Sequence, residues 1–288
     1  MNKRRLFVNL VFFGMLLLTL TSCSIKEDRF PCPCWLDVWL TKVPETDTVR
    51  LFAWPDSIPS RLSLGSGPLS SSVSLGGKTL FNGDYPVAEY PEGYVEKEVR
   101  KGRVGLSAYA CSEALDVSDG VISVPYGSEA PELRAWKDSV LCLGEFAEST
   151  VLFANQFCGV HFNITGSVVP CPYRFVVKGA SGGWDEYDFS PVPGSFSYAF
   201  EADERLEAFF RLPRQDEAWP LELSVYDASR LDGSPLMVLN LGEAVLASGY
   251  DWSAPALSEV WVTLAFGTMS ATLGVHPWGQ GGNINPVI

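Results

Sequence analysis

The chain has 288 residues, of which 47% are apolar, 12% aromatic and 19% charged. This composition is too hydrophobic for an intrinsically disordered protein, and the length is sufficient for two domains with buried cores. Three basic residues and no acidic residue fall within positions 1–22. The remaining chain therefore has 21 − 3 = 18 basic residues against 34 acidic ones, a net charge of −16. Such an acidic chain is a poor partner for nucleic acid.

Residues 1–22 have the pattern of a lipoprotein signal peptide. Three basic residues precede an apolar run over residues 6–20, which is shorter than the roughly 20 residues of a transmembrane helix. Two small residues then precede Cys23, and this arrangement resembles the bacterial lipobox. We expect Cys23 to become the acylated N-terminus that holds the protein on the outer membrane. The alternative is an ordinary secretory signal with a chance cysteine.

Residues 23–31 are expected to form a lipidated tether. Lys26, Glu27 and Asp28 follow the cysteine closely, and this short charged run resembles the surface-export signal of Bacteroidetes lipoproteins. It predicts a protein that faces outward from the cell. A solvated charged tether with no export role explains the same residues.

Six cysteines remain after Cys23, an even number that is consistent with an oxidising compartment: Cys32, Cys34, Cys111, Cys142, Cys158 and Cys171. We expect at least two disulfides, with Cys158 and Cys171 as the leading pair because they flank a candidate hairpin that turns near Gly166. The sequence has no C-x-x-C pair and its two histidines are far apart. We therefore expect no metal site, and no cofactor motif is apparent.

The chain beyond the signal peptide is expected to be all-β. Alternating runs rich in Val, Phe, Tyr and Trp recur between clusters of Gly, Pro, Asp and Ser, which is typical of β-sandwiches. One short helix is expected at 241–247, before Gly249. Strands are expected at 35–43, 49–54, 73–81, 95–111, 139–143, 151–164, 173–178, 195–202, 206–212, 221–226, 260–266 and 271–275.

Two sandwich domains are expected, at 32–150 and 151–288. Residues 55–77 are rich in Ser and Gly and are interpreted as a long surface loop. Dividing twelve strands near residue 150 gives two domains of ordinary size. The glycine-rich run at 179–183 is a competing boundary.

Six short motifs lie along the chain at 32–38, 99–104, 209–213, 241–243, 249–252 and 275–278. Taken in this order, they resemble the FimB-type fimbrial anchor subunits of Bacteroidetes type V pili. The resemblance covers nearly the whole chain. It implies two tandem transthyretin-like (Greek-key) β-sandwich domains and a non-enzymatic role in joining shaft fimbrillin subunits to the outer membrane.

In that family, stalk subunits lose their first strand to an arginine-specific protease and receive a donor strand from a neighbour, whereas anchors keep the first strand. The first strand here contains Trp35, Leu36, Val38 and Leu40. A disulfide from Cys32 or Cys34 to Cys111 or Cys142 would hold it covalently, which favours an anchor. Arg50 follows the first strand and is either a processing site or an ordinary surface residue of the second strand.

The C-terminal tail is the candidate donor strand. A glycine-rich break at 279–282 precedes residues 283–288, whose apolar members are Ile284, Val287 and Ile288. An apolar, β-prone end after a flexible break suits insertion into a neighbouring groove. The alternative is that the tail completes the protein's own sheet.

Catalytic patterns are weak. The run at 179–183 matches G-x-S-x-G, but it lacks the helix that a nucleophile elbow requires and is interpreted as a loop. His276 could complete a triad only from a terminal strand. Cys158 and His161 are expected on opposite faces of a strand. We therefore expect no enzymatic activity.

The rival hypothesis is a surface glycan-binding lipoprotein. Nine tryptophans and ten tyrosines could supply stacking platforms for sugar rings, although core packing explains most of them. Trp136, Trp184 and Trp252 are expected in loops and are therefore the candidate platforms.

Overall fold

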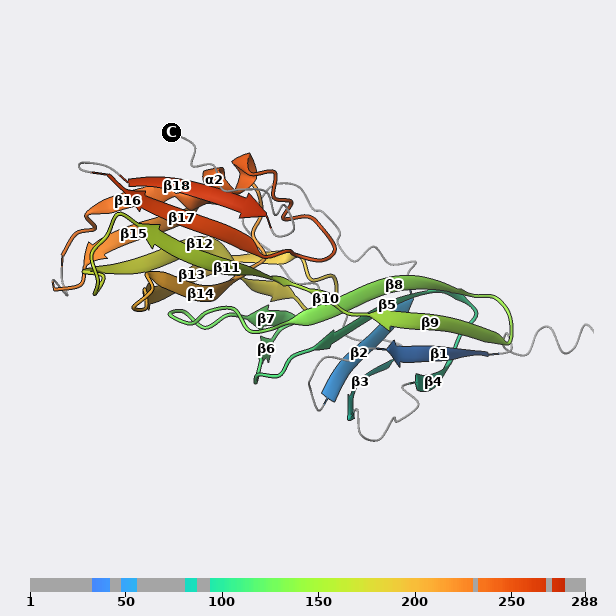
Figure 1. Ribbon diagram of the computed structural model, residues 1–288. Coiled ribbons are helices and arrows are strands. Elements are labelled where there is room, and N and C mark those ends of the chain that lie inside the picture. The colour runs from blue at the N-terminus through green and yellow to red at the C-terminus, as the bar shows by residue number, and fades with distance from the viewer. Residues whose placement is uncertain are drawn as a thin grey trace, which may run out of the picture.

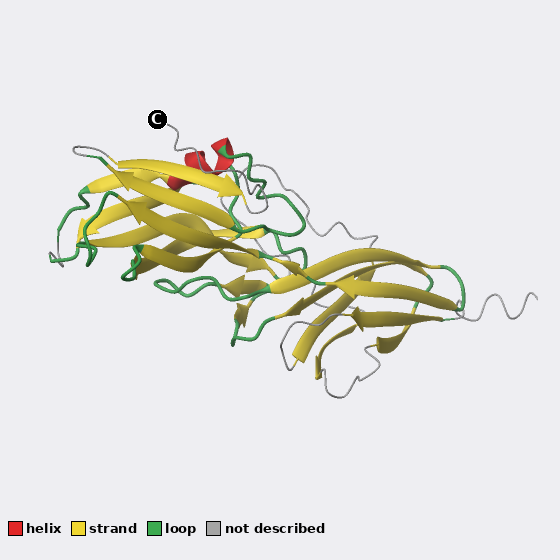
Figure 2. Ribbon diagram, viewed as in Figure 1, coloured by secondary structure: helices red, strands yellow, loops and turns green. Residues whose placement is uncertain are grey.

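The computed structural model describes residues 33–41, 48–55, 81–86, 94–229, 233–267 and 271–277. Within these ranges the chain is almost entirely β, with a single helix, α2 (Leu241–Ala247). Two β-sandwiches lie end to end (Figures 1 and 2). The predicted all-β class is confirmed.

The N-terminal sandwich packs a three-stranded sheet against a five-stranded one. The three-stranded sheet has the order β4-β1-β9, formed by β4 (Tyr94–Val99), β1 (Cys34–Thr41) and β9 (Phe146–Leu152). The five-stranded sheet has the order β10-β8-β5-β2-β3, formed by β10 (Ala154–Asn155), β8 (Arg134–Cys142), β5 (Gly102–Ala110), β2 (Thr48–Pro55) and β3 (Phe81–Pro86).

Alternation along the strands explains this core. Along β1, Leu36, Val38 and Leu40 are buried between the sheets, whereas Trp35, Asp37 and Trp39 alternate with them and are more exposed. Inward-facing residues of β2, β5, β8 and β9 complete the same hydrophobic cluster.

The C-terminal sandwich packs a four-stranded sheet against a larger one. The first has the order β14-β11-β17-β18, formed by β14 (Glu207–Pro213), β11 (Phe157–Thr165), β17 (Val260–Phe266) and β18 (Ala271–Pro277). The second has the order β16-β15-β12-β7-β6, with β13 also paired to β12: β16 (Met237–Asn240), β15 (Leu221–Asp227), β12 (Tyr173–Asp185), β7 (Val121–Ser123), β6 (Asp116–Ser118) and β13 (Pro191–Glu201).

Helix α2 lies at the predicted residues and contacts β15 and β18. Its start is fixed by Asn240, whose side-chain oxygen accepts a hydrogen bond from the backbone N–H of Glu243 at 2.9 Å. The cap satisfies one of the free N–H groups of the first turn.

One segment of the predicted N-terminal domain, residues 116–123, pairs with the second sandwich. Strands β6 and β7 precede β8 in the chain, yet β7 pairs with the end of β12 in the second sandwich. The change from one set of sheets to the other otherwise falls at residue 156, between β10 and β11, against the predicted 150. Residues 116–123 therefore belong to the second sandwich.

Other differences from the predicted strands have local causes. The expected strand 95–111 is two strands, β4 and β5, separated by a turn at 100–101 before Gly102, which has φ +147°. The expected strand 151–164 is divided among β9, β10 and β11. The run at 179–183 lies inside β12, so its interpretation as a loop is wrong. The expected strand at 73–81 lies mostly outside the described residues.

Candidate functional site

The first strand is an integral part of its own sheet. β1 pairs antiparallel with β4 and parallel with β9, from Trp35 opposite Phe146 to Thr41 opposite Leu152. Its inward side chains are almost fully removed from solvent. Without β1, the facing edges of β4 and β9 would both lose their hydrogen-bonding partner, and a groove lined by the core would open between them.

Two cysteines meet at the start of this strand. Cys34 is the first residue of β1 and lies opposite Val99, whereas Cys142 is the last residue of β8 and lies opposite Gly102. Both are fully buried in the same hydrophobic cluster, where their thiols interact, and both are free thiols in this structure. Burial, followed by the nearby Cys34, raises the pKa of Cys142 to about 11.

The other cysteine pairings that the sequence left open differ in geometry. Cys111 follows the opposite end of β5, a strand about 27 Å long at 3.3–3.4 Å per residue, so it is out of reach of Cys34. Residue 32 lies outside the described residues.

The predicted hairpin between Cys158 and Cys171 is wrong, because β11 and β12 belong to different sheets. Cys158 lies near the start of β11, where burial raises the pKa of its thiol to about 12. Cys171 contacts Ser167 just beyond the other end of the strand, about 23 Å away along β11. The structure therefore leaves this pairing without its geometric basis, and both cysteines are free thiols.

Arg50 lies within β2, between β3 and β5. Its guanidinium forms an ion pair with Asp84 at 2.8 Å and lies 5.4 Å from the ring centroid of Phe52. The side-chain hydrogen bond to Asp84 outweighs partial burial and raises the pKa of Arg50. These contacts favour the interpretation of Arg50 as an ordinary strand residue.

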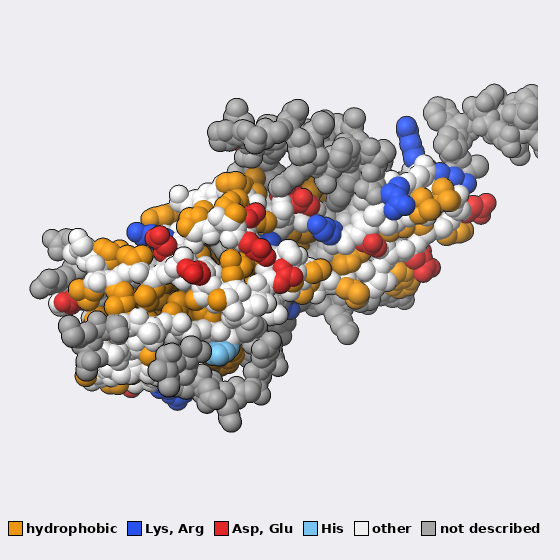
Figure 3. All heavy atoms as spheres, turned by 90° about the horizontal axis from the view of Figure 1, so that it is seen from above, with side chains coloured by type: hydrophobic (Ala, Val, Ile, Leu, Met, Phe, Trp, Pro, Cys, Tyr) orange, Lys and Arg blue, Asp and Glu red, His pale blue; other side chains and the backbone are white. Residues whose placement is uncertain are grey.

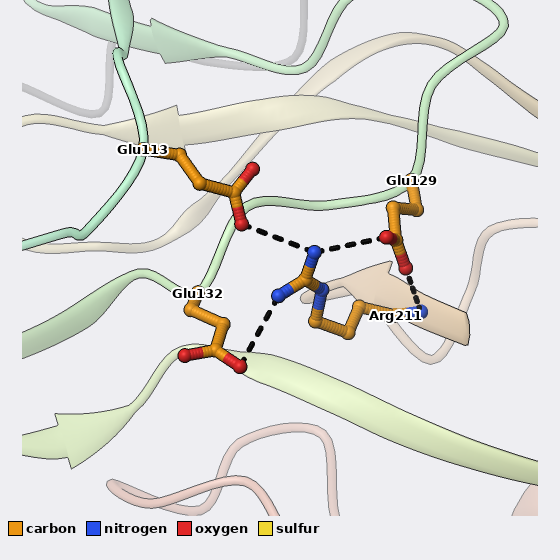
Figure 4. Close-up of polar contacts among 4 residues, drawn as sticks. All are labelled: Glu113, Glu129, Glu132 and Arg211. Carbon is orange, nitrogen blue, oxygen red and sulfur yellow. Dashed lines mark hydrogen bonds and ion pairs between the residues drawn. The ribbon is translucent and has the colours of Figure 1, made fainter. Parts of the chain in front are cut away.

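The joint between the sandwiches contains an ion cluster around Arg211 of β14 (Figure 4). Its guanidinium lies 3.0, 2.9 and 3.2 Å from carboxylate oxygens of Glu113, Glu129 and Glu132. All three acids come from the segment that connects β5 to β8. Partial burial opposes the charge of Arg211, but the three carboxylates outweigh it and its pKa is raised.

Two further contacts fix this joint. The backbone N–H of Ala130 donates to the carbonyl oxygen of Arg211 at 3.0 Å. The hydroxyl of Tyr109, on β5, donates to Glu186 of the second sandwich at 3.1 Å in a buried position. Sequence reasoning missed all of these contacts, because their members are far apart in the chain and no local pattern relates them.

A cavity of about 700 Å³ opens beside the joint. Its lining includes Trp136 of β8, Trp252 and the buried Arg214, which donates to Gln156 at 2.8 Å and to Ala254 at 2.9 Å. Of the three candidate sugar platforms, Trp184 and Trp252 are buried and only Trp136 is partly exposed. Trp184 lies in β12 and Trp136 in β8, so both were wrongly expected in loops.

The catalytic patterns do not assemble. The hydroxyl of Ser181 is buried and donates to the carbonyl of Gly183 at 3.2 Å. His276 lies opposite Trp261 in β18. Cys158 is buried, whereas His161 is half-buried on the other face of β11, stacked on Trp261 and 2.9 Å from Glu259. No group of three metal-ligating side chains occurs among the described residues.

The residues assigned to lipidation and strand donation, Cys23 and Ile284, Val287 and Ile288, lie outside the described residues. None of the helices in the described ranges is long and apolar enough to span a membrane.

No family profile and no curated protein matches the chain. Solved structures with the same fold cover it almost completely. A candidate adhesin from Bacteroides ovatus has a TM-score of 0.58 at 12% identity, covering 87% of this chain and 97% of its own. A candidate polysaccharide-binding protein from Bacteroides thetaiotaomicron has a TM-score of 0.58 at 13% identity, covering 86% and 99%.

The fimbrial anchor protein Mfa2 from Porphyromonas gingivalis is also similar, with a TM-score of 0.56 at 11% identity, covering 86% of this chain and 98% of its own. At these identities the likeness establishes a shared fold. These three proteins are described as a candidate adhesin, a candidate polysaccharide-binding protein and a fimbrial anchor protein.

Proposed function

We propose that this protein is a cell-surface lipoprotein that anchors a type V fimbria to the outer membrane by donating a β-strand, and that it acts without catalysis. The observation that carries the proposal is β1, which lies between β4 and β9 as a fully paired strand. The likeness in fold to a fimbrial anchor and the lipobox at Cys23 support it. The resemblance further suggests that both sandwiches have transthyretin-like topology.

A groove that stays filled in the mature protein distinguishes an anchor from a shaft subunit, because a shaft subunit loses its first strand on cleavage and we propose that this chain keeps its own. A shaft subunit needs an open groove to receive the strand of its neighbour, and the groove between β4 and β9 is occupied here by the protein's own strand. A subunit with no acceptor groove can only donate. It therefore stands at one end of a fibre.

A disulfide between Cys34 and Cys142 would make retention of β1 permanent. The two thiols lie in the same buried cluster, one from each sheet, and interact there. A disulfide-bearing oxidoreductase of the cell envelope would accept their two electrons and two protons and become a dithiol, while one S–S bond forms here. Because burial keeps Cys142 protonated, we expect the bond to form before β1 is packed.

The donor is proposed to be residues 283–288. Ile284, Val287 and Ile288 would fill pockets in the groove of the first shaft subunit, while main-chain hydrogen bonds extend its sheet. A charge at Ile284 or Val287 would be buried without a partner, which should cost several kcal/mol of binding free energy.

Deleting residues 283–288 tests the anchor role. We expect a folded, lipidated protein whose cells shed fibres into the medium. Deletion of the same number of residues from the Ser- and Gly-rich run at 55–77 serves as a control and should leave fibres attached. Firmly attached fibres on cells that carry a stable truncated protein would contradict the donor role, and a destabilised second sandwich would show that the tail pairs with its own sheet.

A second candidate function is glycan binding in the cavity at the joint. The partly exposed Trp136 is a possible stacking surface there, and one protein of the same fold is described as a candidate polysaccharide-binding protein. Binding of soluble polysaccharide that is lost in Trp136→Ala, with fibres unaffected by deletion of the gene, would favour this function over the anchor.

A further inference from the structure

One end of the N-terminal sandwich gathers three chain segments. β1 begins there, β4 turns into β5, and β8 turns into β9. The registers bring them together, because Trp35 lies opposite Phe146, Arg103 lies opposite Leu141, and the backbone N–H of Trp35 donates to the carbonyl of Glu145 at 2.8 Å. We call this end the basal tip and define it by Trp35, Arg100, Lys101, Arg103, Leu141, Leu143 and Phe146.

Four large apolar side chains of the basal tip face solvent. Their exposed fractions are 38% for Trp35, 53% for Leu141, 63% for Leu143 and 67% for Phe146. Trp35 and Phe146 are on the outer face of the three-stranded sheet, and Leu141 is on that of the five-stranded sheet. The apolar surface therefore extends around the end of the sandwich. A contiguous apolar patch that is exposed to solvent is typical of an interaction site.

Basic residues accompany these apolar ones. Arg100, Lys101 and Arg103 are all exposed in and beside the β4–β5 turn. Acidic residues are also near: Glu98 and Glu145 lie at the same end, and Asp37, Glu96 and Glu148 form the next row of the three-stranded sheet. Figure 3 shows basic, apolar and acidic side chains at this end of the molecule. The three basic residues cluster at the β4–β5 turn of a chain of net charge −16, and this turn is the part of the end that would contact an anionic surface.

The chain length between Cys23 and the basal tip places this end near a membrane. Cys34 begins β1 and is 34 − 23 = 11 residues beyond the proposed acylation site. Eleven residues span at most about 40 Å when fully extended. An acylated Cys23 would thus keep the basal tip at a high effective concentration beside lipid headgroups.

We propose that the basal tip binds a lipid surface whose headgroups carry anionic phosphate. Trp35, Leu143 and Phe146 enter the interfacial layer, where aromatic and aliphatic side chains are favoured, while the guanidinium and ammonium groups contact phosphates. This inference rests on the proposed function, since acylation is what brings the membrane within reach. Its consequence is an anchor that stands end-on, with the second sandwich directed away from the cell.

Vesicle binding by the unacylated mature chain tests the surface without the acyl contribution. The full mature sequence with Cys23→Ser is mixed with vesicles of phosphatidylglycerol or of phosphatidylcholine and sedimented. We expect binding to the anionic vesicles that weakens as salt rises, because salt screens exposed charges.

Two sets of variants separate the charged from the apolar contacts. Replacing Arg100, Lys101 and Arg103 with Gln should weaken binding at least tenfold, given about fivefold per basic residue at an anionic surface. Leu143→Ser with Phe146→Ser, which leaves the charge unchanged, should weaken it similarly. The matched controls replace exposed residues of the second sandwich: Arg174, Lys178 and Arg205 with Gln, and Leu236 and Val238 with Ser. The controls should bind as the parent does.

Absence of binding to anionic vesicles, or equal loss in the tip variants and their controls, would overturn the proposal. Sedimentation velocity gives a further arm: a dimer that the tip variants abolish would assign the apolar surface to a second copy of the chain instead. Failure of the anchor role is detected by a different measurement. It would appear as fibres that stay attached when the gene is deleted, whatever the vesicle assay gives.

Discussion

The contact between Cys34 and Cys142 leads to a quantitative prediction about the stability of the N-terminal sandwich. A bond between them would close a loop of 142 − 34 = 108 residues. In the chain-entropy description such a loop contributes about 4.8 kcal/mol, less any strain. Truncating either buried cysteine to alanine also removes about 1 kcal/mol of packing.

Equilibrium unfolding in guanidinium, monitored by tryptophan fluorescence, should reveal the bond through non-additivity. With the bond present, Cys34→Ala and Cys142→Ala each lower the free energy of unfolding by about 3–5 kcal/mol, and the double variant loses only about 1 kcal/mol more. Including a phosphine reductant should lower the parent to about 1 kcal/mol above the single variants, because reduction removes the bond but not the packing of the two thiols. Cys171→Ala, a half-exposed cysteine of the second sandwich, serves as the control and should not respond in this way.

The reasoning is refuted if the parent unfolds identically with and without reductant and the two single losses, each near 1 kcal/mol, simply add. That result would describe two packed thiols and no bond. It would leave the fold of β1 intact but remove its covalent retention.

Three further predictions concern the joint and the second sandwich. Arg211→Met leaves three carboxylates facing each other. Because their side chains are 33–46% exposed, we expect the free energy of unfolding in denaturant to fall by about 2–3 kcal/mol, which is less than for a fully buried pair. The control Arg205→Met, at an exposed residue, should lower it by about 0.5 kcal/mol. Gly166→Ala should cost about 2–4 kcal/mol, since φ is +77° and the new Cβ would lie 2.3 Å from the carbonyl oxygen of Phe266, whereas Gly274→Ala meets nothing within 4 Å. Burial raises the pKa of Glu186 above its usual 4.5, the hydrogen bond from Tyr109 opposing this, so its contribution to stability is present below pH 4.5 and is lost as pH rises through the folded-state pKa. Glu186→Gln should therefore flatten the dependence of the unfolding free energy on pH above pH 4.5, and an unchanged pH dependence would contradict this assignment. For Arg211→Met and Gly166→Ala, an unfolding free energy equal to that of the control variant would contradict the prediction.

Local patterns in the sequence were sufficient for most of the strands and for α2. The alternation of apolar and polar residues predicted β1, and residues 241–247, followed by Gly249 as a stop signal, predicted the helix. The hairpin of β6 and β7 was missed although its signal is present: Asp119-Gly120 joins the two strands, with φ of 51° and 75°. An Asp-Gly pair with positive φ at both positions is typical of a two-residue hairpin turn.

Contacts between distant segments could not be obtained in this way. The four members of the Arg211 cluster come from two regions almost eighty residues apart, and each looks like an ordinary surface charge in its own segment. Likewise, the choice of Cys142 over Cys111 as the neighbour of Cys34 depends on which end of β5 faces the start of β1. Only the register between strands decides that.

The direction of β1 relative to β9 bears on how an anchor would carry force. The two strands are parallel, and both begin at the basal tip. If Cys23 is held by a membrane and a fibre is held by the second sandwich, tension enters β1 at its first residue and leaves β9 at its last. The pair is then loaded in shear, so the hydrogen bonds between them share the load and do not break one after another. A Cys34–Cys142 bond would transfer part of this tension directly to β8, whose neighbour β5 continues into the segment that holds Arg211. Retaining the first strand in parallel pairing thus suits a subunit that ends a fibre at a surface. A strand inserted from another molecule at this position could be pulled out under tension and would detach the fibre.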